Sequence, residues 1–375
     1  MILSEEQILI RDTARAFAQE QVLPHVRAWE AAGEIPRALL GEMGRMGFMG
    51  MTVPAEWGGA GADMVSYVLA LEEIAAADGG LSTVMSVNNS PDCAALLTYG
   101  STEQKEKWLK PLAKGEILGA FCLTEPHAGS DASNLKTRAV RKGNGWVLNG
   151  VKQFITSGKI AKLAIVYAVT DPEAGKKGIT AFLVPTNRPG YFVDKVEVKL
   201  GQGASDTCAL RFEELFLEED LRLGAEGDGY RIALSNLETG RLGIASQAVG
   251  MAQAALEIAC GYAKERRSMG KAIIEHQAIG FRLADLATRL EAARQLLLHA
   301  AALKDAGLPC MREASMAKLF ASEAAEAICT GAIQTLGGYG YLEEFGLAKI
   351  YRDVRVCQIY EGASEVQRMV IARSL

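Results

Sequence analysis

The chain has 375 residues, with 40 lysines and arginines against 45 aspartates and glutamates, and 49% of its residues are apolar. This length predicts two or three domains and a large apolar core that needs no disulfide support. The balanced composition excludes a disordered or collagen-like chain. A net charge of −5 argues against a nucleic-acid binder or a protein of anionic membranes, since both depend on basic surface.

The seven cysteines are odd in number, and no two of them have CxxC spacing. This pattern is typical of reduced thiols in a cytoplasmic protein, and it indicates neither a disulfide framework nor a zinc site. The N-terminus lacks the basic and then apolar layout of a signal peptide, and no apolar run reaches the roughly 18 residues of a membrane span. We therefore expect a soluble cytoplasmic protein without membrane insertion.

Residues 1–118 have the periodicity of helices. Ser4 and Gln7 have the spacing of a capping box at the start of the first helix. Pro36 suits the first turn of a second helix, and Gly47 suits its end. The whole stretch predicts an N-terminal helical domain.

Residues 119–226 change to a period close to two, which predicts β-strands. Asn144-Gly145 and Asn149-Gly150 are both hairpin signals between alternating apolar and polar residues. Three further stretches have strand composition, namely residues 161–169, 178–185 and 191–200. Several short strands with close turns predict an antiparallel sheet or barrel.

From residue 227 onward the chain returns to helical periodicity. The segments are long, rich in alanine, leucine and methionine, and nearly free of proline; they cover residues 228–269, 277–305, 311–337 and 363–373. Helices of this length usually pack as a bundle. The predicted α+β architecture is therefore a helical domain over 1–118, a β domain over 119–226 and a helical bundle over 227–375.

Three segments combine residues in unusual ways. Residues 121–133 lead from a strand into a turn of hydroxyls and glycine, which could present N–H groups to a ligand or simply turn the chain. Residues 334–346 contain paired glycines, which permit close backbone approach to a ligand but also suit a helix end. In residues 352–373, Glu361 precedes a helix that Ser364 would cap. Burial would make this glutamate a stronger base, although the residues by themselves favour a surface glutamate stabilised at a helix N-terminus.

In this order, the three segments resemble the acyl-CoA dehydrogenase family over essentially the whole chain, and the short-chain, butyryl-CoA branch most of all. Further matches lie at residues 53–61, 154–158, 238–256, 262–277 and 359–365. The resemblance implies an N-terminal helical domain, a middle antiparallel β domain and a C-terminal four-helix bundle, assembled as a homotetramer. The family binds FAD without a Rossmann motif, which accounts for the lack of GxGxxG after any predicted strand.

The resemblance also implies which residues bind the cofactor and the substrate. FAD would contact Phe121, Leu123, Thr124, Gly129, Ser130, Phe154, Ile155, Thr156, Arg266, Gln277, Gln334, Leu336, Gly337, Gly338, Ala363, Ser364 and Glu365. Of these, Arg266 and Gln277 would reach the adenosine diphosphate part of a neighbouring subunit's FAD. The acyl-CoA would contact Ser130, Glu238, Arg241, Tyr360 and Gly362.

The resemblance assigns the catalytic base to Glu361, which would remove the α-proton of the acyl thioester. The β-hydride would go to flavin N5, the product would be a trans-2-enoyl-CoA, and an electron-transferring flavoprotein would collect the electrons, as in fatty acid β-oxidation. Gly240 stands where other branches carry their base. Ser82 stands where glutaryl-CoA dehydrogenases carry an arginine for the distal acid group. We therefore expect a short or branched-short monoacid acyl-CoA as the substrate.

Two alternatives have different chemistry. An acyl-CoA oxidase would pass its electrons to oxygen, and hydrogen peroxide formation in air would reveal it. A flavin-bearing relative that binds DNA would need an added basic domain, and retention on heparin at physiological salt would reveal that one. His127 fits a surface turn better than a catalytic role. The depth of the acyl pocket, and hence the chain length accepted, does not follow from residue identities.

Overall fold

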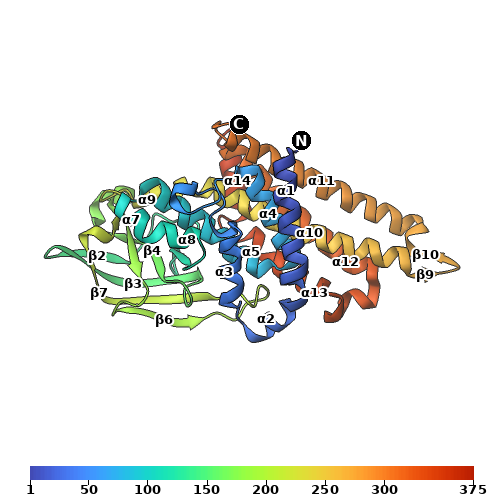
Figure 1. The fold of residues 1–375 in the computed structure, drawn as a ribbon, viewed down its shortest axis with the longest axis horizontal. Coiled ribbons are helices and arrows are strands. Elements are labelled where there is room, and N and C mark those ends of the chain that lie inside the picture. The colour runs from blue at the N-terminus through green and yellow to red at the C-terminus, as the bar shows by residue number, and fades with distance from the viewer.

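The computed structural model describes all 375 residues. The first part of the chain is helical, as predicted (Figure 1). Its helices are α1 (Glu5–Phe17), α2 (Val26–Ala32), α3 (Arg37–Arg45), α4 (Met64–Ala77), α5 (Gly79–Val87), α6 (Ala94–Tyr99), α7 (Thr102–Gln104) and α8 (Lys110–Ala113).

Side-chain caps fix where several of these helices begin. The capping box at α1 is present, with Ser4 Oγ accepting from Gln7 N and the Gln7 side chain accepting from Ser4 N. Pro36 is the residue before α3 and not part of its first turn, which is a small correction to the sequence-based expectation. Asp63 caps α4, and nearly every side chain of that helix is buried. A helix buried on all sides must lie inside the protein, and α4 runs between α1 and the long helix α10 (Leu237–Glu265).

The middle part forms one eight-stranded sheet. Its strands are β1 (Gly119–Cys122), β2 (Arg138–Lys142), β3 (Gly145–Thr156), β4 (Leu163–Val169), β5 (Ile179–Pro185), β6 (Tyr191–Val196), β7 (Thr207–Glu218) and β8 (Arg222–Leu223). The strand order is β6-β7-β3-β2-β4-β5-β8, and β1 pairs with β4. The prediction of an antiparallel sheet was incomplete, because β1 and β2 both run parallel to β4 and the sheet is therefore mixed.

Of the two predicted hairpin turns, only the first exists. The chain turns between Lys142 and Gly145, which pair with each other across β2 and β3. Asn149-Gly150 lies within β3, where the pairing with β7 shifts register and Gly150 has a φ of 152°. The long partner strand β7 continues past this point, so the local turn signal yields a bulge instead of a hairpin.

The C-terminal part contains α9 (Gly229–Ser235), α10, α11 (Gln277–Asp305), α12 (Met311–Leu336), α13 (Leu347–Val354) and α14 (Ser364–Ala372). The first predicted helix is divided at Asn236, and a short hairpin of β9 (Arg267–Ser268) and β10 (Lys271–Ala272) follows α10. Ser364 does not cap α14; Ala363 is the N-cap residue and no side chain caps this end.

Apolar packing links the regions in a way that the chain order hides. One cluster of 56 buried residues joins helices of the first part to the C-terminal bundle. A second cluster of 37 fills the sheet and includes residues of α6 and α8. In Figure 1 the sheet lies at one end, the long helices α10 to α12 extend to the other, and α1 and α4 lie between them. No helix of the structure has both the length and the apolarity needed to cross a membrane.

Candidate active site

Glu361 lies in the short connection before α14, on a backbone that few side chains adopt. Its φ is 51°, and the φ of the following Gly362 is 95°. A left-handed conformation is unfavourable for a residue with a Cβ, and it persists where the surrounding structure determines it. The connection therefore presents the Glu361 side chain in a direction that a regular helix start would not give.

The Glu361 carboxyl group faces titratable groups from four parts of the chain, and no protein donor bonds to it. Burial raises its pKa to about 7, against the weaker opposing effect of Lys318 on α12 and Arg241 on α10. Its charge is also felt by Tyr67 on α4 and by Asp92. A carboxylate with a pKa close to neutrality and with free lone pairs is suited to accept a proton.

Gly240 on α10 provides the space that the Glu361 carboxylate occupies. A Cβ at this position would lie 1.9 Å from Glu361 Oε2, so any side chain there would displace the carboxylate. From the sequence, Gly240 is only a position that offers no competing base. The structure adds that the absence of a side chain is itself a condition for the placement of Glu361.

The two segments expected to contact flavin lie side by side at the edge of the sheet. Gln153 N donates to Thr124 O over 2.9 Å, and Lys152 Nζ donates to Leu123 O over 3.1 Å. The Phe121 ring packs on Tyr167 with their centroids 4.9 Å apart, while Gly129 and Ser130 are exposed at the following turn. The residues that follow β1 and the second half of β3 thus form one continuous edge with polar and aromatic groups.

A buried ion pair that sequence analysis missed anchors this edge. Glu125 and Lys152 are both nearly inaccessible, and Lys152 Nζ lies 2.8 Å from Glu125 Oε1. The backbone N–H groups of Lys136 and Thr137 also donate to Glu125, at 2.7 and 3.1 Å. Burial alone would raise the pKa of Glu125, but these donors hold it below its ordinary value. The alternation of β3 was the one available signal, since it places Lys152 on the buried face.

His127 has a local role in the same turn. Its Nε2 lies 3.0 Å from Asn134 O and 3.7 Å from Glu125 Oε2, and the side chain is 31% exposed. These contacts link the two sides of the loop between β1 and β2. They agree with the expectation of a turn residue.

Phe154 is displayed at the surface instead of being buried in the sheet. Its ring is 65% exposed and its φ is 60°, at a point where the pairing of β3 with β7 is irregular. Its neighbour Ile155 is buried in the sheet core, and Thr156 is half-buried. An exposed aromatic ring on strained backbone, next to a polar edge, is an arrangement that a stacked planar ligand would cover.

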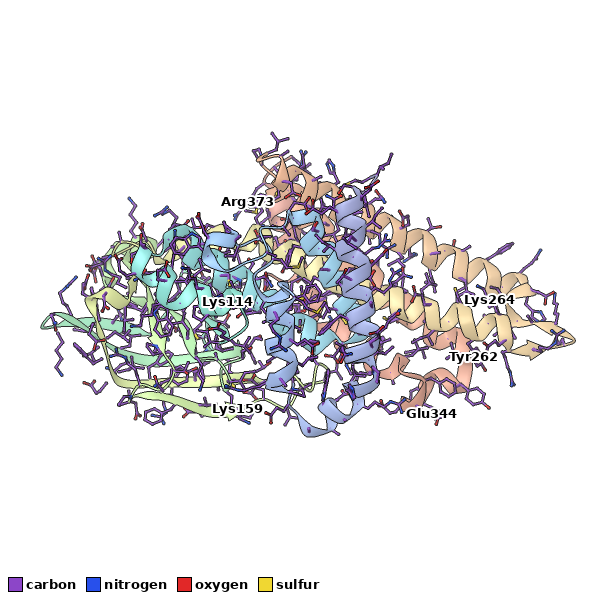
Figure 2. All side chains as sticks on the ribbon, in the orientation of Figure 1. Lys114, Lys159, Tyr262, Lys264, Glu344 and Arg373 are labelled. Atoms are coloured by element: carbon purple, nitrogen blue, oxygen red, sulfur yellow. The ribbon has the colours of Figure 1, made fainter.

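The remaining predicted cofactor residues divide into two groups. Ala363, Ser364 and Glu365 begin α14, directly after Glu361. Arg266 and Gln277 flank the β9–β10 hairpin at the far end of the bundle, remote from the sheet, where Figure 2 labels the nearby Tyr262 and Lys264. The segment with Gln334, Leu336, Gly337 and Gly338 ends α12 at the same place, because the following Tyr339 packs on Tyr262 with ring centroids 6.1 Å apart. One copy of the chain therefore does not bring all the predicted cofactor residues together.

The predicted substrate residues occupy different environments. Glu238 is held by Lys304 of α11 over 2.6 Å. Arg241 is buried, donates to Ser315 Oγ over 3.2 Å, and has an Nε without a partner. Tyr360 is half-buried and donates to Gln247 Oε1 over 2.6 Å. Of this group, Tyr360 and Gly362 adjoin Glu361 in sequence, and Arg241 is close enough to affect its pKa.

Family models match the three parts of the chain in order. They are the acyl-CoA dehydrogenase N-terminal domain over residues 4–116, the middle domain over 120–215 and the C-terminal domain over 227–375. An acyl-CoA dehydrogenase of Bacillus subtilis is 47% identical over 375 residues, which are 100% of this chain and 99% of the relative. The chain belongs to the acyl-CoA dehydrogenase family. Acyl-CoA dehydrogenases are flavin-dependent oxidoreductases with FAD as their cofactor.

Solved structures of acyl-CoA dehydrogenases and of related assemblies have the same fold. Butyryl-CoA dehydrogenase from Megasphaera elsdenii superposes with a TM-score of 0.97 at 40% identity, covering 100% of this chain and 99% of that one. A chain in the structure of the electron transferring flavoprotein of Acidaminococcus fermentans gives a TM-score of 0.98 at 43% identity, covering 100% and 98%. The resemblance to the family and the expected class of fold are thus confirmed.

The residues present fit a bound FAD. Ser364 Oγ, at the start of α14, is buried without a hydrogen-bond partner. The exposed Phe154 ring offers a stacking face, and no protein atom lies within 4 Å of where a Cβ would sit on Gly129, Gly337 or Gly338. Unsatisfied buried polar groups and open backbone are what a polar cofactor would complete in an acyl-CoA dehydrogenase.

Proposed function

We propose that this protein oxidises a short or branched-short acyl-CoA to the trans-2-enoyl-CoA, with Glu361 as the catalytic base. The observation that supports this best is the environment of Glu361, whose carboxylate is held without a hydrogen bond and whose pKa burial raises to about 7. A thioester α-proton is weakly acidic, so its removal needs a positioned base that is unprotonated near neutral pH. Glu361 combines this pKa with a location beside the predicted substrate residues Tyr360 and Gly362.

In the proposed reaction the C–H bond at Cα breaks, its proton moves to a Glu361 carboxylate oxygen, and its electron pair forms the new double bond. Bound FAD supplies the acceptor for the β-hydrogen, which leaves with its bonding electrons. In this proposal the backbone N–H of Glu361 stabilises the charge that develops on the thioester oxygen. Gly240 and Gly362 keep the carboxylate and its backbone in place.

The proposed acyl length follows from a cluster of hydrogen-bonded side chains between α5 and α10, which we call the polar crossing. Gln247 Nε2 donates to Ser82 Oγ and Thr83 Oγ1, both over 3.0 Å, and its Oε1 accepts from Tyr360. Gln247 lies two turns beyond Gly240 on α10, which is about 10 Å along the helix axis. We propose that these buried, mutually bonded side chains limit the depth of the acyl pocket beside Glu361, which would favour a short acyl group.

The same crossing argues against a substrate with a distal acid group. Ser82 is fully buried and bonds to Gly79 O and Gln247, so it offers no positive charge for a second carboxylate. A carboxylate placed there would lose its hydration without a charged partner. A monoacid acyl-CoA is therefore the proposed substrate class.

The distribution of the cofactor residues supports assembly of several copies. Arg266 and Gln277 flank the β9–β10 hairpin at the end of the bundle opposite the sheet, which supports a role for them in the site of a neighbouring subunit. We infer a homo-oligomer, with the tetramer of the family as the expected state and domains over 1–118, 119–226 and 227–375. The likeness to a chain in an electron transferring flavoprotein structure supports such a flavoprotein as the electron acceptor. A cytoplasmic location agrees with these assignments.

Anaerobic titration of the yellow holoenzyme with acyl-CoA thioesters tests the proposed function. Butyryl-CoA and isobutyryl-CoA should bleach the flavin absorbance, octanoyl-CoA should do so far more slowly, and glutaryl-CoA should leave it unchanged. The proposal is wrong if glutaryl-CoA or octanoyl-CoA is turned over efficiently while butyryl-CoA is inert. Formation of hydrogen peroxide in air at the rate of turnover would favour the oxidase alternative.

A further inference from the structure

The carbonyl group of Gly362 receives two side-chain donors from two different helices. Lys318 Nζ of α12 donates to Gly362 O over 2.6 Å, and Gln367 Nε2 of α14 donates to it over 2.9 Å. Gln367 Nε2 also lies 3.4 Å from Glu361 O. Side-chain donors to the carbonyl oxygens of Glu361 and Gly362 therefore hold these two residues in their left-handed conformation. An ordinary helix N-terminus does not need such donors.

Lys318 is an unusual residue to use for a single backbone hydrogen bond. Its side chain is fully buried, and Gly362 O is its only hydrogen-bond acceptor; no carboxylate lies within salt-bridge distance. A buried ammonium group without a counter-ion is costly, so a residue that served only to fill space would be better replaced by an apolar one. Burial lowers the pKa of Lys318 to about 8, which leaves it largely charged at neutral pH.

The charges around Glu361 are arranged to act on it without bonding to it. Lys318 and Arg241 are the two cations that face it, from α12 and α10, and neither donates a hydrogen bond to its carboxylate; Lys318 donates to Gly362 O, and Arg241 donates through Nη1 to Ser315. Tyr67 of α4 and Asp92 are the other titratable groups that face it. A direct salt bridge would occupy the lone pairs that must accept the proton, whereas a nearby charge favours the ionised carboxylate and leaves those lone pairs free.

We propose that Lys318 is a positioning residue for the reaction, which fixes the left-handed turn through Gly362 O and supplies a positive charge that keeps Glu361 ionised. This inference rests on the proposed function, since it concerns the base of that reaction. The two parts of the role are separable, because Gln367 shares the hydrogen bond but carries no charge.

Three variants of the holoenzyme separate the two parts. Lys318→Gln removes the charge and keeps a donor, Gln367→Met removes a donor and keeps the charge, and Lys318→Met removes both. The readouts are the pH dependence of butyryl-CoA oxidation and of the binding of a butyl-CoA thioether, which cannot lose an α-proton. Flavin content and the thermal unfolding midpoint are measured for each variant to establish that it is folded.

We expect Lys318→Gln to move the acid limb of both pH profiles upward from about 7, by about one pH unit, with KM at high pH unchanged. Gln367→Met should lower kcat and leave the acid limb where it is. Lys318→Met should show both effects. If Lys318→Met does not fold, Lys318→Gln and Gln367→Met alone decide the outcome.

An unmoved acid limb in a folded, flavin-bearing Lys318→Gln variant would overturn the role in ionisation. A shift of equal size in Gln367→Met would overturn it as well, because the effect would then arise from the turn and not from the charge. Failure of the proposed function is distinguishable from both results, since in that case the wild-type protein would not oxidise butyryl-CoA.

Discussion

Glu125 is buried and Glu361 is half-buried, both near the predicted flavin site, and their surroundings are opposite. Glu125 is bonded by a buried lysine and by two backbone N–H groups, and its pKa lies below the ordinary value. Glu361 has no donor on its side chain, and burial raises its pKa to about 7. The donors that bond to Glu125 and are missing at Glu361 separate a carboxylate that holds a loop together from one that can take up a proton.

The strongest test of this contrast is the removal of the reactive carboxylate. Glu361→Gln should lower kcat with butyryl-CoA by roughly 10²- to 10⁴-fold, because an amide cannot accept the α-proton. Flavin content and the unfolding midpoint should stay near those of the wild type, since no hydrogen bond of the Glu361 side chain is lost. Glu344→Gln, at an exposed position remote from the sheet (Figure 2), is the matched control and should be fully active. Near-normal turnover by Glu361→Gln would contradict the assignment.

Changes to the buried ion pair of Glu125 and Lys152 should instead affect the stability of the protein. Lys152→Met leaves Glu125 buried without its cation, so we expect the free energy of unfolding to fall by about 3–5 kcal/mol. Combining it with Glu125→Gln removes the uncompensated charge and should restore part of that loss. Urea unfolding of the single and double variants measures the difference. Equal stability of the two would show that the pair is not what anchors the edge of the sheet.

Moving the reactive carboxylate without removing it should have an intermediate effect. In Gly240→Ala the new methyl group takes the space of Glu361 Oε2, and the displaced base should lower kcat by up to about 10²-fold. Gly261→Ala is the control on the same helix, because its Cβ would meet no atom within 4 Å. Wild-type kcat in Gly240→Ala would mean that the carboxylate has another productive position.

The smallest expected effect concerns Asp92, another carboxyl group of the core. It is buried, and neither of its oxygens has a hydrogen-bond partner. Burial raises its pKa well above the ordinary value, so the folded protein retains a proton that the unfolded chain releases. Stability is therefore lost as pH rises above about 4, the pKa range of an unfolded aspartate. Asp92→Asn should be more stable than the wild type by on the order of 1 kcal/mol at pH 8 and equally stable at pH 4. A destabilised Asp92→Asn at pH 8 would indicate that the ionised carboxylate is needed.

Sequence patterns correctly predicted the helices and strands that residues close together in the chain determine. The capping box at Ser4, the long helices of the bundle and the alternation of the strands all follow from residues close in sequence. Predictions went wrong where a distant partner decided the outcome. Asn149-Gly150 became a bulge because β7 pairs along the full length of β3, and β1 joins the sheet in parallel through β4.

The candidate site shows the same division. Glu361 beside Gly362 could be identified from the sequence as a possible base, and the resemblance of the motifs identified the family. The anchoring pair of Glu125 and Lys152 was not found, because nothing near either residue in the sequence indicates the other. Lys318 was missed for a related reason, since a lysine within a long helical segment looks like an exposed residue until its burial is known.

The sequence alone determined the order of the helical and β regions, the family, and the residue types available for flavin chemistry. The tertiary structure decided which carboxylates are bonded and which are free, and it separated Arg266 and Gln277 from the rest of the predicted cofactor residues. The physical reason is that the charges around Glu361 come from α4, α10 and α12, which lie far apart along the chain. Reactivity at a carboxylate is a property of those distant neighbours, and residue identity states only that a carboxylate is there.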